Sequence, residues 1–194
     1  MFLPHPPSIP SEGEPLYELV RAVRICHPGW EIASPGTFAV APGPGLSWRE
    51  WNVRLFQPVL RPLLEDAYRA ARRGQGAGLL ACDRQADDAL PLAPAAASRR
   101  AGMKLLQGHS VPTGERVWWR YAGRVATGMT PGHLAVAVAV RAAAFHLPPA
   151  LLSAAYLVLE ARGARLDEEP GGVLSMVEAC LIRETGTEPN VWVA

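Results

Sequence analysis

The chain has 194 residues, of which 49% are hydrophobic and 19% charged, and its formal net charge at pH 7 is +1. This length is enough for one domain with a sizeable core but not for two full domains, and the apolar content excludes a disordered chain. A net charge near zero gives no bulk attraction to nucleic acid or anionic lipid. We therefore expect one folded domain over residues 1–194, with neither nucleic acid nor membrane among its partners.

The N-terminal region predicts an extended arm followed by a helix. Residues 1–14 contain several prolines and no basic segment typical of a signal peptide, so they are expected to be extended. Apolar residues then recur at helical spacing over residues 16–26, which predicts a helix. Residues 28–45 are rich in proline and glycine towards their end, which is typical of a loop.

The middle of the chain opens with a clear helix start. Ser47 followed by Glu50 forms a capping-box pattern, in which each residue can satisfy the backbone of the other. The helix is predicted to run from Trp48 toward Gly74, with a bend or break around the two prolines at positions 58 and 62. Three further helices are expected at 75–89, 94–107 and 114–127.

The last third of the sequence is the most apolar. Thr130 followed by Pro131 predicts a hydroxyl N-cap and a helix that continues to about Phe145. The alternation over residues 134–140 could also form a buried strand, but the dominance of alanine favours a helix. Another helix is expected over 148–163, then a polar connection and a last short helix over 172–182. The fold class is thus an all-α single-domain bundle of about seven to eight helices with a Pro-rich N-terminal arm.

Two observations bear on the compartment. The apolar region 134–159 is interrupted by Arg141, His146 and a proline pair, so it holds no run long enough to span a membrane. The three cysteines are odd in number and far apart, which fits a reducing compartment. We expect a cytoplasmic protein.

Sequence motifs for catalysis are missing. The chain lacks a phosphate-binding P-loop, a dinucleotide-binding glycine pattern, a His-Glu-x-x-His or Cys-x-x-Cys metal motif and a Gly-x-Ser-x-Gly elbow. We therefore predict that the protein is not an enzyme and needs no cofactor. Cys26 and His27 are the only adjacent pair of soft metal ligands, and a buried cysteine at a helix end is the preferred interpretation.

Other polar and aromatic groups admit two interpretations each. His133 could face an anion or a partner, although a solvated histidine in a first helical turn is preferred. Solvated faces are also favoured for two carboxylate groups, and core packing is favoured over a nucleic-acid stacking surface for four tryptophans. Arg116, Arg120 and Arg124 form a basic stripe that could meet an acidic partner or simply face solvent. The carboxylate groups are Asp83 with Asp87 and Asp88, and Asp167 to Glu169, and the tryptophans are Trp48, Trp51, Trp118 and Trp119.

The order of several segments resembles that of the urease accessory protein family UreF. The similar segments are Ala70 to Gly74, Leu79 to Asp83, Ala97 to Leu106, Gly132 to Val136, Leu147 to Pro149, Ala155 to Leu157 and Arg183 to Thr185. Upstream, Pro35-Gly36-Thr37-Phe38 stands where the family carries a Gly-Gly-Phe stretch. The resemblance extends over most of the chain.

This resemblance implies an all-α chaperone, often a homodimer, that is not itself an enzyme. It implies three partners for nickel insertion: a nickel-carrying UreG-like GTPase, a second accessory subunit of the UreD/UreH type and apo-urease. Gly36 and Phe38 would face the GTPase. Arg183 and Glu184 would lie at the start of a flexible tail over 184–194, which becomes ordered when it binds the second accessory subunit. His133 completes the predicted partner-binding residues.

Two alternatives remain open. A helical ligand-binding protein or enzyme would carry a deep pocket between helices, lined by residues such as Tyr156, Trp118 or His133. A UreF paralogue could scaffold a different assembly, since the serines and glutamate that the family carries after Phe38 are replaced here by Ala39 to Pro42.

Overall fold

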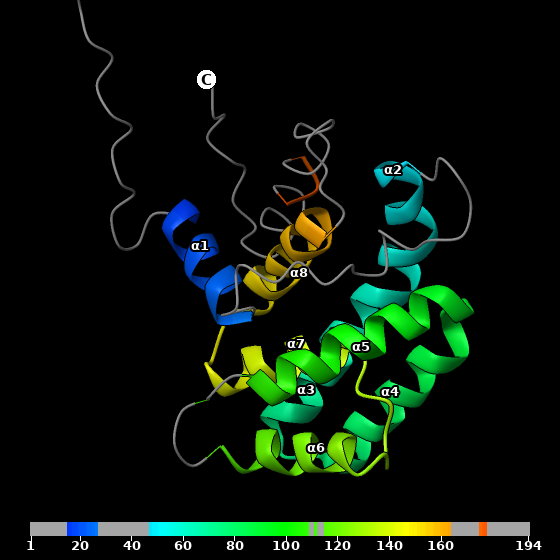
Figure 1. The fold of residues 1–194 in the computed structure, drawn as a ribbon. Coiled ribbons are helices and arrows are strands. Elements are labelled where there is room, and N and C mark those ends of the chain that lie inside the picture. The colour runs from blue at the N-terminus through cyan, green and yellow to red at the C-terminus, as the bar shows by residue number, and fades with distance from the viewer. Residues whose placement is uncertain (1–14, 27–46, 109–110, 112–114, 164–174, 178–194) are drawn as a thin grey trace, which may run out of the picture.

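The computed structural model consists of α-helices, one of which is preceded by a π-helical stretch (Figure 1). It describes residues 15–26, 47–108, 111, 115–163 and 175–177. No β-strand occurs within these ranges, so the predicted all-α class is confirmed. The eight α-helices in the described part of the chain also match the predicted number. The extended arm, the loop over 28–45 and the flexible tail lie outside the described residues.

The first helices follow the predicted boundaries closely. α1 spans Pro15–Cys26, and the capping box at Ser47 starts α2, Trp48–Trp51. The backbone N–H of Glu50 donates to the Ser47 hydroxyl at 3.2 Å, and the Glu50 carboxylate accepts from the backbone N–H of Ser47 at 3.1 Å. These reciprocal bonds satisfy donors that a helix start otherwise leaves open.

The predicted bend near the prolines takes the form of a π-helix. This stretch, η1, covers Asn52–Leu60 and contains Pro58, whose missing N–H would break a regular α-helix. Pro62 lies in the first turn of α3, Arg61–Arg72, where a proline is tolerated. Four aromatic rings stack in sequence from this region onto the helix that contains residue 156: Trp48, Trp51, Phe56 and Tyr156.

The remaining helices are α4 to α8. Their bounds are Gly76–Ala89, Leu92–Gly108, Arg116–Ala126, Leu134–Ala144 and Pro149–Gly163. The predicted start of α7 was wrong by three residues, because Thr130 is not its N-cap and His133 takes that position. None of the helices in the described ranges is both long and apolar enough to cross a membrane.

α7 lies at the centre of the bundle. All eleven of its residues are buried, and it contacts α1, α3, α4, α5, α6 and α8. Ten of its residues are apolar and the remaining one is Arg141, so almost every side of α7 must be covered by other helices. Alanine and valine keep the helix narrow enough for close neighbours. The helical interpretation of residues 134–140 is therefore confirmed over the strand alternative.

Candidate functional site

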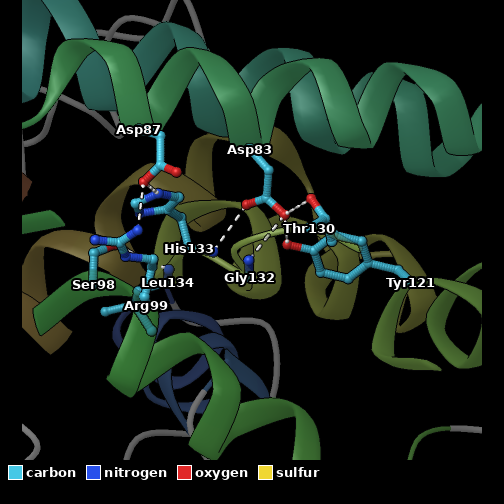
Figure 2. A network of polar contacts seen from close by, with 9 residues as sticks. All are labelled: Asp83, Asp87, Ser98, Arg99, Tyr121, Thr130, Gly132, His133 and Leu134. Carbon is cyan, nitrogen blue, oxygen red and sulfur yellow. Dashed lines mark hydrogen bonds and ion pairs between the residues drawn. The ribbon is translucent and has the colours of Figure 1, made fainter. Parts of the chain in front are cut away.

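A buried carboxylate organises the junction where three helices meet the start of α7. Asp83, on α4, is 0% exposed and accepts four hydrogen bonds (Figure 2). Its Oδ2 accepts from the Tyr121 hydroxyl at 2.8 Å, the Thr130 hydroxyl at 2.8 Å and the backbone N–H of Gly132 at 3.1 Å. Its Oδ1 accepts from the backbone N–H of His133 at 2.9 Å. We call this cluster, with its neighbours Asp87, Ser98, Arg99 and Leu134, the α7 entry network.

The α7 entry network caps α7 from outside the helix. The side chain of His133, the N-cap residue, makes no capping bond. Asp83 accepts from the two backbone N–H groups before the helix, and the Ser98 hydroxyl accepts from the N–H of Leu134 at 3.1 Å. These groups would otherwise be buried donors without acceptors. A negative charge also interacts favourably with the N-terminal end of a helix dipole.

The backbone of this junction is too tightly packed for larger residues. Gly132 has a φ of +76°, which only glycine adopts at low cost, and a Cβ there would lie 2.5 Å from the Val125 side chain. Gly102, on α5, lies against the same loop, and a Cβ on it would lie 2.1 Å from the Gly132 carbonyl oxygen. The close approach of α5 is what brings Ser98, one turn earlier, within reach of Leu134.

His133 forms the second half of the α7 entry network. Its Nε2 lies 2.9 Å from the Asp87 carboxylate, which also pairs with Arg99 at 3.2 Å. Burial lowers the pKa of His133, while the hydrogen bond to Asp87 and the charge of Asp83 act in the opposite direction. The preferred interpretation of His133 as a solvated side chain was wrong, because the residue is 0% exposed.

The geometry of the α7 entry network fits a structural role better than catalysis. A general base needs a lone pair within reach of a substrate, whereas both oxygens of Asp83 are occupied and buried. Burial, followed by the charge of Asp83, raises the pKa of the Tyr121 hydroxyl well above its usual value, so this group stays protonated as a donor.

The carboxylates of α4 show where sequence reasoning missed the network. The solvated interpretation was wrong for Asp83 and correct for Asp88, which is exposed. Asp87 is partly buried. The four-residue spacing of Asp83 and Asp87 was the available signal, since it places both on one helical face.

The cysteine predicted as a weak metal ligand does not fit that role. Cys26 is the buried last residue of α1, and burial raises its pKa to about 12. A cysteine binds a metal as the thiolate, and the burial of Cys26 disfavours that charged form. The preferred interpretation as a buried cysteine at a helix end is confirmed, and its neighbour His27 lies outside the described residues. Across the described ranges no group of three or more candidate ligands comes together.

Three of the four tryptophans considered for a stacking surface are in the core. Trp48, Trp51 and Trp118 are buried, as predicted, but Trp119 is 58% exposed. Arg116, Arg120 and Arg124 are all exposed along α6. Two grooves flank this helix, one of about 200 Å³ against α4 and one of about 290 Å³ against α5. Neither groove is lined by His133, Trp118 or Tyr156.

Of the five predicted partner-binding residues, only His133 falls within the described ranges. Gly36, Phe38, Arg183 and Glu184 lie outside them. The burial of His133 means that its imidazole contributes to the shape of the loop before α7. The partner-binding role of all five remains a prediction.

Comparison with known proteins gives one result. A family model described as UreF matches residues 49–164, which is more than half of the chain. The matched range runs from α2 to the end of α8 and so includes both the α7 entry network and α6. No curated protein and no solved structure gives a significant match.

Proposed function

The chain belongs to the UreF family of urease accessory proteins, and from this premise we propose that it is a scaffold for nickel insertion. It bridges a nickel-carrying UreG-like GTPase and a second accessory subunit of the UreD/UreH type to apo-urease. The observation that carries this proposal is the family match over residues 49–164. Nickel is the cargo of the assembly and not a resident cofactor of this chain.

The geometry of the described residues supports action by contact. The charged groups that the fold buries at the start of α7 are held by hydrogen bonds from the chain itself. Such groups stabilise a shape, and a scaffold works by presenting shape and charge to its partners. The row of exposed arginines on α6 (Arg116, Arg120 and Arg124) and the exposed Trp119 supply a surface of that kind.

Four of the predicted partner-binding residues belong to the two ends of the chain. We assign Gly36 and Phe38 to the contact with the GTPase, and Arg183 and Glu184 to the contact with the second accessory subunit. His133 acts as a positioning residue for the loop before α7. A cytoplasmic location and a homodimer are part of the same proposal.

Co-expression tests the proposal directly. The tagged full-length chain is produced with the urease accessory GTPase, the second accessory subunit and apo-urease of its own organism, and the retained proteins are identified. We expect a stable complex that weakens in Phe38→Ala or Arg183→Ala, with helical circular dichroism unchanged. Leu92→Ala, at an exposed position on α5, is the matched control.

The possible results separate the claims. Failure of the folded wild-type chain to retain any of the three proteins would contradict the scaffold role. Retention that is the same in wild type and in both variants would remove Phe38 and Arg183 from the contact residues and leave the scaffold role intact.

A further inference from the structure

The outer side of α6 combines exposed apolar side chains with exposed arginines. Figure 1 shows α6 at the end of the bundle away from α1 and α8. One flank of α6 and the facing side of α5 form the groove of about 290 Å³, while three arginines run along the helix as a ridge. We call the groove and the ridge together the α6 surface. The groove is lined by Met103, Leu106, Gln107, Trp119, Ala122, Gly123, Val125 and Ala126, and the ridge consists of Arg116, Arg120 and Arg124.

The groove exposes large apolar side chains that the fold does not use. Trp119 is 58% exposed and Met103 is 39% exposed. Tryptophan, methionine and arginine are enriched at protein interfaces, and tryptophan and arginine are the residues that most often dominate binding energy. Single exposed apolar residues are common on soluble proteins, but here two of them line one groove beside a row of arginines.

The floor of the groove is made of small residues. Ala122, Gly123 and Ala126 lie along the α6 side, and a Cβ added to Gly123 would meet nothing within 4 Å. Because these side chains are small, a helix of another protein could approach the backbone of α6 closely along the groove between α5 and α6. Insertion of the apolar side of an amphipathic helix into such a groove is a common mode of protein recognition.

The arginines of the ridge favour a binding partner with negative charge. Arg116, Arg120 and Arg124 recur every four residues, and within the described ranges none of them forms an ion pair. Arg120 and Arg124 also line the second groove, and no acidic residue lines either groove. The nearest acidic neighbour along the chain is Glu115, which precedes the helix. Three adjacent positive charges without internal partners are complementary to carboxylates on a binding partner.

We propose that the α6 surface docks an acidic amphipathic helix of another protein, with its apolar side in the groove around Trp119 and its carboxylates against Arg116 and Arg120. This inference rests on the proposed scaffold function and deepens it, since it assigns one of the partners to a defined place on the fold.

The first test measures binding of the full-length chain to each of the three partners named above. Trp119→Ala is expected to raise the dissociation constant for one partner about 30-fold, as for a strong interface anchor. The double variant Arg116→Glu/Arg120→Glu is expected to weaken the same complex and to remove its salt dependence. Glutamate at position 116, in the first turn of α6, is favourable for the helix dipole, and position 120 is exposed, so the double variant is expected to keep α6 folded.

Matched controls share the chemistry but lie elsewhere. Arg49→Glu/Arg54→Glu makes the same charge change on α2 and η1, and Leu92→Ala truncates a side chain that is 83% exposed. Both are expected to leave the dissociation constant within about twofold, in keeping with the small effect of most residues outside a hot spot. Circular dichroism and urea denaturation confirm that all variants are folded.

A cross-linking experiment identifies the occupant. A photo-reactive phenylalanine analogue placed at position 119 of the full-length chain is irradiated in the assembled complex. The cross-linked peptide is expected to come from a partner helix with alternating apolar and acidic faces.

Each result decides a separate question. If wild type captures a partner and the α6 variants capture it equally well, the docking site is refuted and the scaffold role stands. If wild type captures none of the three, both inferences fail. A cross-link from position 119 to a second copy of this chain, or to another segment of the same chain, would also overturn the proposal.

Discussion

The α7 entry network and the α6 surface place side chains in opposite ways. The network buries a carboxylate, Asp83, which accepts four hydrogen bonds from within the chain. The α6 surface exposes Trp119, although its neighbour Trp118 is fully buried. A buried charge is tolerated where hydrogen-bond donors of the chain surround it. A large apolar side chain that is exposed can contribute to binding where a partner covers it. A side chain's chemical type therefore says less about its role than whether the fold itself satisfies it.

The two adjacent tryptophans give the strongest test of this contrast. Trp118→Ala should lower the free energy of unfolding by about 4 kcal/mol, because it opens a cavity in the core. It also removes the ring on which the Arg141 guanidinium lies, 5.4 Å from the ring centroid. Trp119→Ala should lower the free energy of unfolding by less than about 1 kcal/mol. Urea denaturation followed by circular dichroism measures both, and similar losses in the two variants would show that Trp119 is also part of the core.

The second test compares two carboxylates of α4. Asp83→Ala should lower the free energy of unfolding by about 3 kcal/mol, because it leaves buried donors without an acceptor. Asp88→Ala, on the exposed side of the same helix, should change it by no more than about 0.5 kcal/mol. Thermal and urea unfolding provide the measurement. A loss below 1 kcal/mol for Asp83→Ala would contradict the capping role assigned to it.

The third test applies one substitution to two glycines. Gly102→Ala should destabilise by about 2 kcal/mol, because the new methyl group collides with the Gly132 carbonyl. Gly123→Ala should instead stabilise by up to about 1 kcal/mol, since the site is open and alanine is the better helix former. The same methyl group raises the floor of the α6 groove, so Gly123→Ala should also weaken partner binding. A stabilised variant with undiminished binding would argue against a helix seated in that groove.

The smallest effect concerns pH. The pKa of buried His133 is lowered from its usual value of 6.5, so the unfolded chain takes up this proton before the folded chain does. Stability is therefore expected to fall as the pH drops below about 6.5, with a slope of at most 1.4 kcal/mol per pH unit from this residue.

The variant His133→Gln isolates the contribution of this histidine from that of the rest of the chain. The difference in unfolding free energy between wild type and variant, measured from pH 8 to pH 5, should change only in the lower half of that range. A constant difference would mean that His133 titrates alike in the folded and unfolded chains.

The helices were predictable because their signals are local. The capping box at Ser47, the apolar spacing of α1 and the alanine-rich run of α7 each depend on residues close together in sequence. Within the described residues the predicted boundaries were close except at the start of α7, and the boundaries of the helix predicted over 172–182 lie outside them. There the Thr130-Pro131 pair has the usual form of a helix start, but the Thr130 hydroxyl donates to a side chain 47 positions away and the helix begins later.

The α7 entry network was missed for the same physical reason. The spacing of Asp83 and Asp87 places both on one helical face but does not show that this face is buried, because the four groups that donate to Asp83 come from α6 and the loop after it. The basic stripe of α6 was recognised from its four-residue spacing. The exposure of Trp119 was not, since two adjacent tryptophans differ only in which side of the helix faces α7.

The π-helix η1 has a consequence for how the length of this chain can change. Trp51 and Phe56 are both buried although they are five residues apart, a separation that would place them about 140° apart around a regular α-helix. Each turn of η1 contains more residues than a turn of an α-helix, so the extra residue does not rotate Phe56 away from the buried side. That side continues through Leu60 and Leu64. Deleting exposed Val53 would restore α-helical spacing between the same buried positions. The π-helix thus lets the chain hold one more residue between two buried aromatic side chains than a regular α-helix would, so a shortened variant of this segment is expected to keep the same core contacts.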